Sequence, residues 1–144
     1  MGKLLGIARK AKSGAPMEEI HAAGVTVEQG LEGDYRGKLR RRQISVLARE
    51  DWEATCAEHG KDLAWTTRRA NLLVEGVALK EATGSRLKIG DVVLEIYCET
   101  DPCTIMDKAS PGLRRALEPD WRGGVCCRVI KGGRISLGDD VDFI

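Results

Sequence analysis

The sequence VCCRVIKGGRISLGD, residues 125–139, contains two short apolar segments, each followed by a turn signal. Val125–Ile130 and Arg134–Ser136 are short and rich in β-branched residues, which is typical of strands. Lys131-Gly132-Gly133 separates the two segments, and Leu137-Gly138-Asp139 follows the second. Glycine-rich turns of this kind join consecutive strands of an antiparallel sheet. This stretch therefore predicts successive antiparallel strands, with Val141–Ile144 as the last.

Segments of the same kind recur toward the N-terminus. They are Leu4–Arg9, Gly24–Glu28, Gln43–Ala48, Asn71–Glu75 and Asp91–Tyr97, with turn signals at Glu32-Gly33-Asp34 and Ile89-Gly90-Asp91. Short strands with many turns, in a chain with 17 glycines, suit a sheet curled into a barrel. A doubly wound α/β fold would instead need a helix after nearly every strand. We therefore expect a mainly β fold, a closed or partly open antiparallel β-barrel forming one domain over residues 1–144.

Two segments are predicted to be short helices. Glu50–His59 has acidic residues in its first turn, and it ends in histidine followed by Gly60, a typical C-terminal signal. Ser110–Leu117 begins with a serine that suits the N-cap and has Pro111 at the first helical position. Both interrupt the strand pattern without changing the fold class.

Composition excludes several classes of protein. The chain has 23 Lys and Arg against 22 Asp and Glu, so its overall charge favours neither a nucleic acid nor an acidic partner. No apolar run approaches the roughly 20 residues that a membrane-spanning helix needs. The apolar N-terminal stretch is short and closed by Arg9 and Lys10, unlike a signal peptide. We expect a cytoplasmic protein without a membrane partner, whose five cysteines are reduced.

Cys103 is the leading candidate for chemistry. It follows Pro102, which cannot donate to a sheet ladder, so the strand before it should end first. That places a soft nucleophile on a loop at the rim of the sheet, where functional residues concentrate. The alternative is a buried cysteine that serves only as a small hydrophobic residue.

The other four cysteines are interpreted as structural. Cys56 lies on the apolar side of a helix, and Cys98 shares the parity of the apolar residues in its strand, so both are expected in the core. Cys126 and Cys127 are adjacent in a strand and should point to opposite faces. Because the paired spacing of zinc ligands is missing, a zinc site is not expected.

Several cations and one amide are candidates for ligand binding. Arg36–Arg42 holds five cations in seven residues, after the turn that contains Asp34, and forms either a phosphate grip or a solvated turn. Arg69 and Asn71 share parity if their strand starts early, so both could face one pocket, unless they only cap an edge strand. Arg128 is a cation inside an apolar strand, facing either a pocket or the solvent. Aromatic residues are sparse near these cations, which argues against a single-strand nucleic-acid surface.

The order of these motifs resembles the MOSC family, which is named for the C-terminal domain of molybdenum cofactor sulfurases. The shared features are the Gly-Asp turn at 33–34, Arg-x-Asn at 69–71 before a strand ending in Glu-Gly, Leu-x-Ile-Gly-Asp-Val at 87–92, Pro-Cys at 102–103, Gly-Gly-Val-x-x-Arg-Val at 123–129 and Gly-Asp-x-Val at 138–141. The similarity runs from about Gly24 to Val141. It implies a β-barrel with a pocket around one reactive cysteine, which in relatives binds molybdenum in a pterin cofactor or is proposed to carry sulfur.

The resemblance also implies roles for particular residues. Cys103 matches the reactive cysteine as a metal ligand or persulfide carrier. Arg69 and Asn71, Asp34 and Arg128 match further family positions and, with Arg36, are expected to bind the molybdenum cofactor (molybdopterin). Cys126 and Cys127 have no equivalent in the family pattern. The expected partners are this cofactor or the proteins that synthesise or sulfurate it.

The family pattern also sets what this chain is expected to lack. Full sulfurases carry a pyridoxal-phosphate desulfurase domain, and amidoxime-type reductases carry an extra N-terminal barrel. Neither is expected here, so we predict a stand-alone module without pyridoxal phosphate. Three hypotheses remain: a cofactor-binding or sulfur-carrying module, a molybdenum-dependent oxidoreductase with an external electron donor, and a non-enzymatic barrel that binds anions or nucleic acid.

Overall fold

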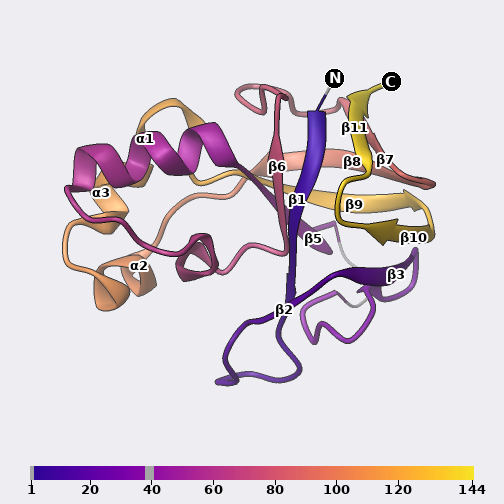
Figure 1. The fold of residues 1–144 in the computed structure, drawn as a ribbon, viewed down its shortest axis with the longest axis horizontal. Coiled ribbons are helices and arrows are strands. Elements are labelled where there is room, and N and C mark those ends of the chain that lie inside the picture. Colours follow the sequence, from indigo (N-terminus) through magenta and orange to yellow (C-terminus); the bar gives the residue numbers. More distant parts are fainter. Residues whose placement is uncertain (1, 38–40) are drawn as a thin grey trace.

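The apolar segments pair edge to edge into one large sheet in the computed structural model, which describes residues 2–37 and 41–144. Its strands are β1 (Gly2–Arg9), β2 (Glu18–Ile20), β5 (Ile44–Ala48), β6 (Leu72–Glu75), β7 (Arg86–Ile89), β8 (Val92–Glu99), β9 (Val125–Lys131) and β11 (Asp140–Phe143). They follow the order β11-β7-β8-β9-β5-β6-β1-β2, and β11 also pairs with the start of β1. That pairing closes seven of the described strands into a barrel, which confirms the predicted fold class (Figure 1).

The barrel is mixed, because β5 and β6 run parallel, whereas the sequence pattern predicted antiparallel pairing. Parallel neighbours need a long crossover connection, and a helix supplies it here: α1 (Arg49–His59), followed by the 3-10 helix η1 (Trp65–Arg68). Both elements lie outside the barrel wall. This crossover carries the polar segment around Arg69 to the outer face of β5 and β6.

A smaller sheet packs against the barrel. Its strands are β3 (Ala22–Thr26), β4 (Gly30–Leu31) and β10 (Gly133–Ser136), in the order β10-β3-β4. The predicted strands are found within a few residues of their expected bounds, but β2, β4 and β7 were missed. β7 alternates exposed Arg86 and Lys88 with buried Leu87 and Ile89, as a half-buried strand does, but it is only four residues long and has two apolar side chains.

Strand alternation separates an inner core from an outer one. Inside the barrel, residues such as Ile44, Val46, Leu94 and Cys127 are almost fully buried. On the outer face of β5 and β6, Leu47 and Leu73 instead pack with helical residues in a second apolar cluster. That cluster attaches the helices to one side of the barrel, as Figure 1 shows.

The predicted start of the helix Ser110–Leu117 is wrong, although its predicted end is correct. The structure has α2 (Thr104–Ala109) directly after Cys103 and a separate α3 (Leu113–Leu117), with the 3-10 helix η2 (Pro119–Trp121) following. Ser110 ends α2 instead of capping a new helix, and its hydroxyl lies 2.7 Å from His59 Nε2. Asp107 Oδ1 accepts hydrogen bonds from the backbone N–H groups of Gly112 and Arg114, and so supplies the cap that Ser110 was expected to give α3.

The predicted helix Glu50–His59 is confirmed as α1, which starts one residue earlier and ends at the left-handed Gly60. Among the described residues, no helix is long and apolar enough to cross a membrane.

Candidate functional site

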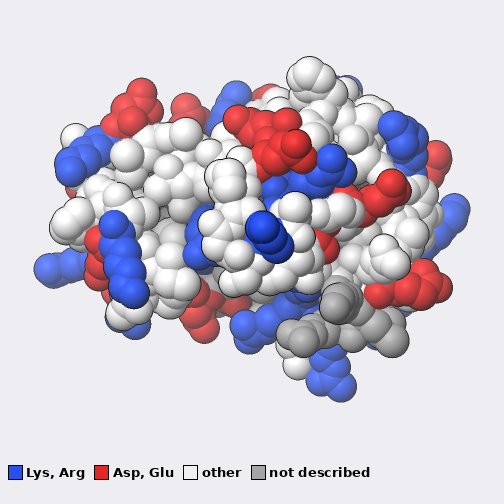
Figure 2. All heavy atoms as spheres, turned by 90° about the horizontal axis from the view of Figure 1, so that it is seen from below, with Lys and Arg blue, Asp and Glu red and all other residues white. Residues whose placement is uncertain are grey.

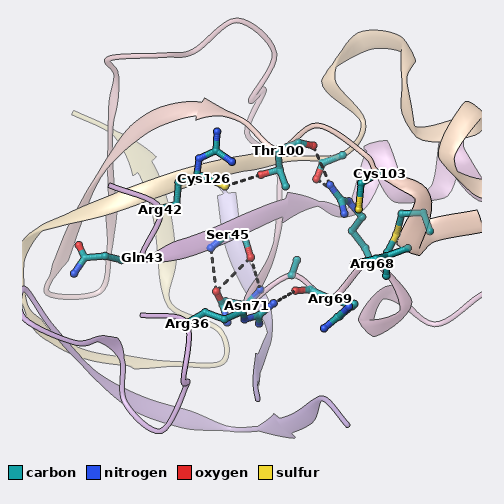
Figure 3. A pocket seen from close by; sticks show the side chains of 14 residues that line it. Arg36, Arg42, Gln43, Ser45, Arg68, Arg69, Asn71, Thr100, Cys103 and Cys126 are labelled. Carbon is teal, nitrogen blue, oxygen red and sulfur yellow. Dashed lines mark hydrogen bonds between the residues drawn. The ribbon is translucent and has the colours of Figure 1, made fainter. Parts of the chain in front are cut away.

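A cavity of about 300 Å³ lies outside the barrel, where the outer faces of β5 and β9 meet the loops around η1 and α2. Four arginines line it: Arg36, Arg42, Arg68 and Arg69. Its other polar lining comes from Gln43, Ser45, Asn71, Thr100 and the thiols of Cys103 and Cys126 (Figure 3). Apolar lining comes mainly from α2, at Ile105 and Met106. The cavity therefore combines a positive lining with two soft nucleophiles.

Cys103 lies at the edge of this cavity, as its position after Pro102 predicted. It is exposed and immediately precedes α2, where its carbonyl oxygen accepts a hydrogen bond from Met106 N at 3.0 Å. Arg69 and Asn71 line the same cavity, so the structure brings these three residues together. Their roles toward a ligand remain predictions.

Arg68 is the central cation of the site, and the sequence offered no signal to choose it over Arg69. Its side chain is buried, and it donates to the carbonyl oxygens of Gly123 (3.1 Å) and Thr100 (2.9 Å). Burial lowers the pKa of the Arg68 guanidinium, while the nearby Cys103, Cys126 and Asp101 oppose that shift. Arginine nevertheless stays charged at neutral pH. Figure 3 shows its guanidinium beside Cys103.

Gly123 makes room for Arg68. A Cβ atom at this position would lie 2.5 Å from the Thr100 carbonyl oxygen and 3.0 Å from Arg68 Nη2. Both atoms belong to the hydrogen bonds that hold the guanidinium, so any larger residue would displace it. Gly123 is thus a requirement of the site.

Cys126 and Cys127 point to opposite faces of β9, as predicted. Cys126 lines the cavity and its Sγ lies 3.1 Å from Thr100 Oγ1, whereas Cys127 is sealed inside the barrel. Burial raises the pKa of the Cys127 thiol, so it stays protonated and inert.

Cys98 does not lie in the core, contrary to the parity argument. The register between β8 and β9 shifts between Ile96 and Cys98, which leaves Tyr97 as an extra residue. This bulge places Cys98 opposite Cys126, on the outer face of the barrel, and leaves it half-buried. Cys56 is also only half-buried, although it packs against the outer apolar cluster.

The Asn71 side chain mainly links neighbouring strands through hydrogen bonds to Ser45 on β5 and Ala8 on β1. Its Oδ1 accepts from the backbone N–H of Ser45 (3.0 Å) and from the Ser45 hydroxyl (3.3 Å), and its Nδ2 donates to the Ala8 carbonyl (3.2 Å). Two of its three side-chain contacts therefore fix β5 at the cavity floor. One amide hydrogen of Nδ2 is left for a ligand.

Arg36 bridges Asp34 and Arg69. It donates to the Arg69 carbonyl oxygen (3.1 Å) and to Asp34 Oδ1 (3.4 Å). Asp34 is buried and does not line the cavity, so it positions Arg36 instead of touching a ligand as predicted. Arg69 adopts a left-handed conformation (φ 67°) at the end of η1, so it is not in a strand with Asn71. Within the described chain, Arg36 Nε and Asp34 Oδ2 are buried without a hydrogen-bond partner.

Arg128 lies outside the cavity, which corrects the expectation that it would bind the cofactor. It is exposed on β9 opposite Glu95, and its Nε donates to Glu95 Oε1 at 2.8 Å. It shares its face with Cys126, but Arg128 is exposed whereas Cys126 is buried. Of the two interpretations of Arg128, the structure therefore shows the solvent-facing one.

The cationic run at 36–42 divides into parts with different surroundings. Arg36 and Arg42 line the cavity, whereas Arg41 donates to the Tyr97 hydroxyl at 3.1 Å. Lys38 and Arg40 fall outside the described residues. On the face seen in Figure 2, basic and acidic side chains are interspersed and no broad basic surface is formed.

A metal cluster made by protein side chains alone is not found in the described part of the chain. No three His, Cys, Asp or Glu residues there are arranged to hold a metal ion.

The chain matches the profile of the MOSC domain over residues 17–142. It belongs to the MOSC domain family. This family is associated with molybdenum cofactor binding in general. No curated protein matches the chain.

Solved structures show the same fold at low sequence identity. The YuaD protein from Bacillus subtilis has a TM-score of 0.84 at 20% identity, over 99% of this chain and 96% of that one. YiiM from Geobacillus stearothermophilus has a TM-score of 0.80 at 15% identity, over 100% and 75%. YiiM from Escherichia coli has a TM-score of 0.75 at 16% identity, over 99% and 69%. At such identities the likeness supports the MOSC fold alone.

Proposed function

We propose that this protein binds the molybdenum cofactor in the arginine-lined cavity, with Cys103 as the thiolate that ligates the metal or carries sulfur. The observation that carries the proposal is the convergence of Cys103 and four arginines on one cavity. Soft thiolates suit molybdenum and sulfane sulfur better than they suit hard cations. The family assignment supports the choice of cofactor over other anions.

The residues present fit an anionic heterocycle. Arginine guanidinium groups bind phosphate oxygens two at a time, and no acidic side chain is among the described residues that line the cavity. Arg36 Nε, buried without a partner within the described residues, is a donor available to a ligand oxygen. A cavity of about 300 Å³ lies at the lower end of the range for ligand sites, roughly 300–1,000 Å³.

The protein residues would divide the work of binding. Arg36, Arg42 and Arg69 would hold the phosphate, and the free amide hydrogen of Asn71 would meet a polar edge of the ring system. Arg68, fixed by two backbone carbonyls, would favour the thiolate form of the neighbouring Cys103. When bound, the cofactor supplies molybdenum redox chemistry.

The test compares freshly purified wild-type protein with the Cys103→Ser variant. Molybdenum is measured by elemental analysis, pterin by fluorescence, and sulfane sulfur by release with cyanide. We expect cofactor or sulfur in the wild type and its loss in Cys103→Ser. Cys56→Ser is the matched control, because Cys56 lies on α1 and does not line the cavity.

The same measurements separate the two roles of Cys103. Molybdenum and pterin that depend on Cys103 indicate metal ligation, whereas sulfane sulfur on Cys103 without molybdenum indicates a sulfur carrier. Reduction of an N-hydroxyl or N-oxide compound by loaded protein and an external electron donor would extend the proposal to an oxidoreductase. Full loading of the Cys103→Ser variant, with the control equally loaded, would refute both roles.

A further inference from the structure

Cys98 and Cys126 form a cross-strand pair of thiols in the outer wall of the barrel. They are directly opposite each other in the antiparallel register of β8 and β9. Residues so placed have Cα atoms about 4.5–5.5 Å apart, within the range of about 4.4–6.8 Å that disulfides bridge. The bulge at Tyr97 creates this pairing, because it brings Cys98 to the face that Cys126 occupies.

One thiol of the pair is accessible from solvent. Cys98 is half-buried and therefore reachable from solvent, while Cys126 is buried and lines the cavity. Burial and then the Cys126 thiol raise the pKa of Cys98, and Arg42 opposes them. The mutual influence of the two thiols agrees with their opposed positions in the sheet. Thr100 Oγ1 lies 3.1 Å from Cys126 Sγ and forms a hydrogen bond with the inner thiol.

We propose that Cys98 and Cys126 are a modification site that hydrogen peroxide oxidises to a reversible disulfide. The Cys98 thiolate attacks one peroxide oxygen, the O–O bond breaks, and the leaving oxygen departs as water after protonation. The resulting Cys98 sulfenic acid is attacked by the Cys126 thiolate, which forms the S–S bond and releases a second water. Two thiols are thus oxidised and one peroxide is reduced. The reaction does not depend on a bound cofactor.

No other pair of cysteines is placed for this reaction. Cys127 is sealed inside the barrel opposite Ile96 and points away from Cys126. Cys56 lies on α1, on the far side of the outer apolar cluster. Cys103 lines the cavity with Cys126, but it precedes α2 and is not opposite Cys126 in the sheet; Figure 3 shows Arg68 beside Cys103, while Cys126 contacts Thr100.

The disulfide would change the cavity wall. Cys126 Sγ would leave the Thr100 hydroxyl, and the carbonyl oxygen of Thr100 is one of the two acceptors that hold Arg68. Hydrogen peroxide would therefore act next to the central cation of the proposed cofactor site.

The experiment treats the purified protein with one equivalent of hydrogen peroxide and blocks the remaining thiols with iodoacetamide. A protease that cleaves before aspartate separates Cys98 (peptide 91–100) from Cys103 (peptide 101–106) and leaves Cys126 in peptide 120–138. We expect loss of two hydrogen atoms from the intact protein, a link between 91–100 and 120–138, and its reversal by dithiothreitol. Fragmentation of the linked peptide assigns the bond to Cys126 or Cys127.

Variants decide the assignment. Cys98→Ser changes a half-buried residue, so it is expected to fold, and it should abolish the linked peptide. Cys56→Ser and Cys103→Ser should leave the linked peptide unchanged, and circular dichroism checks the fold of each. A link that includes peptide 101–106, a link that persists in Cys98→Ser, or alkylated Cys98 and Cys126 in peroxide-treated Cys103→Ser, where the exposed thiol no longer competes for the oxidant, would each overturn the proposal.

Discussion

The two faces of β5 and β9 differ sharply although each strand supplies both. The inner face carries Ile44, Val46 and Cys127, which are nearly free of solvent contact inside the barrel. The outer face of the same strands carries Ser45 and Cys126, which line the arginine-rich cavity. Side chains one residue apart therefore serve packing on one side and ligand chemistry on the other. The barrel interior stabilises the fold, and the site is built on its outer wall.

The largest expected effect comes from the inner face. Ile44→Ala should lower the free energy of unfolding by about 2–5 kcal/mol, because it leaves a cavity in a closed core. Its neighbour Ser45→Ala should cost only about 0.5–1.5 kcal/mol, since it loses hydrogen bonds with Asn71. Urea denaturation of both variants measures the difference. Equal losses would mean that the two faces are not energetically distinct.

The next effect concerns two arginines on the outer face. Arg68→Ala should cost about 1.5–3 kcal/mol of stability, because it removes charged hydrogen bonds to the buried carbonyls of Gly123 and Thr100. Arg128→Ala removes only an exposed ion pair with Glu95, so its effect on stability should be much smaller than that of Arg68→Ala.

Thermal unfolding compares the stability of these two variants, and pterin fluorescence compares their loading. Only Arg68→Ala should lose cofactor, so equal loading of both would exclude Arg68 from the site.

The smallest effect is a shift in a pH profile. Because burial and Cys126 raise the pKa of Cys98, less Cys98 thiolate exists at a given pH than in free cysteine. Its alkylation rate should therefore rise at higher pH than that of free cysteine, and Cys126→Ser should move the profile back toward lower pH. Iodoacetamide labelling followed through peptide 91–100 gives both profiles. If the alkylation rate of Cys98 rises at the same pH as that of free cysteine, or at a lower pH, then Cys98 is not partly buried beside Cys126.

The barrel could be predicted because local patterns decide it. Gly-Gly and Gly-Asp turns between short β-branched segments need no long-range information, and the position of Cys103 follows from Pro102. The bulge at Tyr97 could not be predicted, since it depends on the register between β8 and β9. It moved Cys98 from the expected core to the outer face.

The arginines show the same limit. Arg69 and Asn71 do share a cavity, but the parity argument for them fails, because Arg69 is left-handed at the end of a 3-10 helix. Arg68 became the central cation only through the carbonyls of Gly123 and Thr100, which come from distant segments. Arg128 has the parity of Cys126, yet it is exposed and is not among the residues that line the cavity. The parity of a residue in a strand predicts which face of the sheet its side chain occupies. Only the three-dimensional structure shows which part of that face lines the cavity.

The central claim is that the outer cavity, with Cys103 at its edge, holds the molybdenum cofactor. The direct test measures site-resolved iodoacetamide labelling of the apoprotein with and without cofactor released from a molybdoenzyme. We predict that Cys103 is labelled first among the five thiols, because it is the exposed one, and that cofactor slows its labelling while Cys56 is unaffected. An unchanged rate at Cys103 while the cofactor is bound would contradict the account.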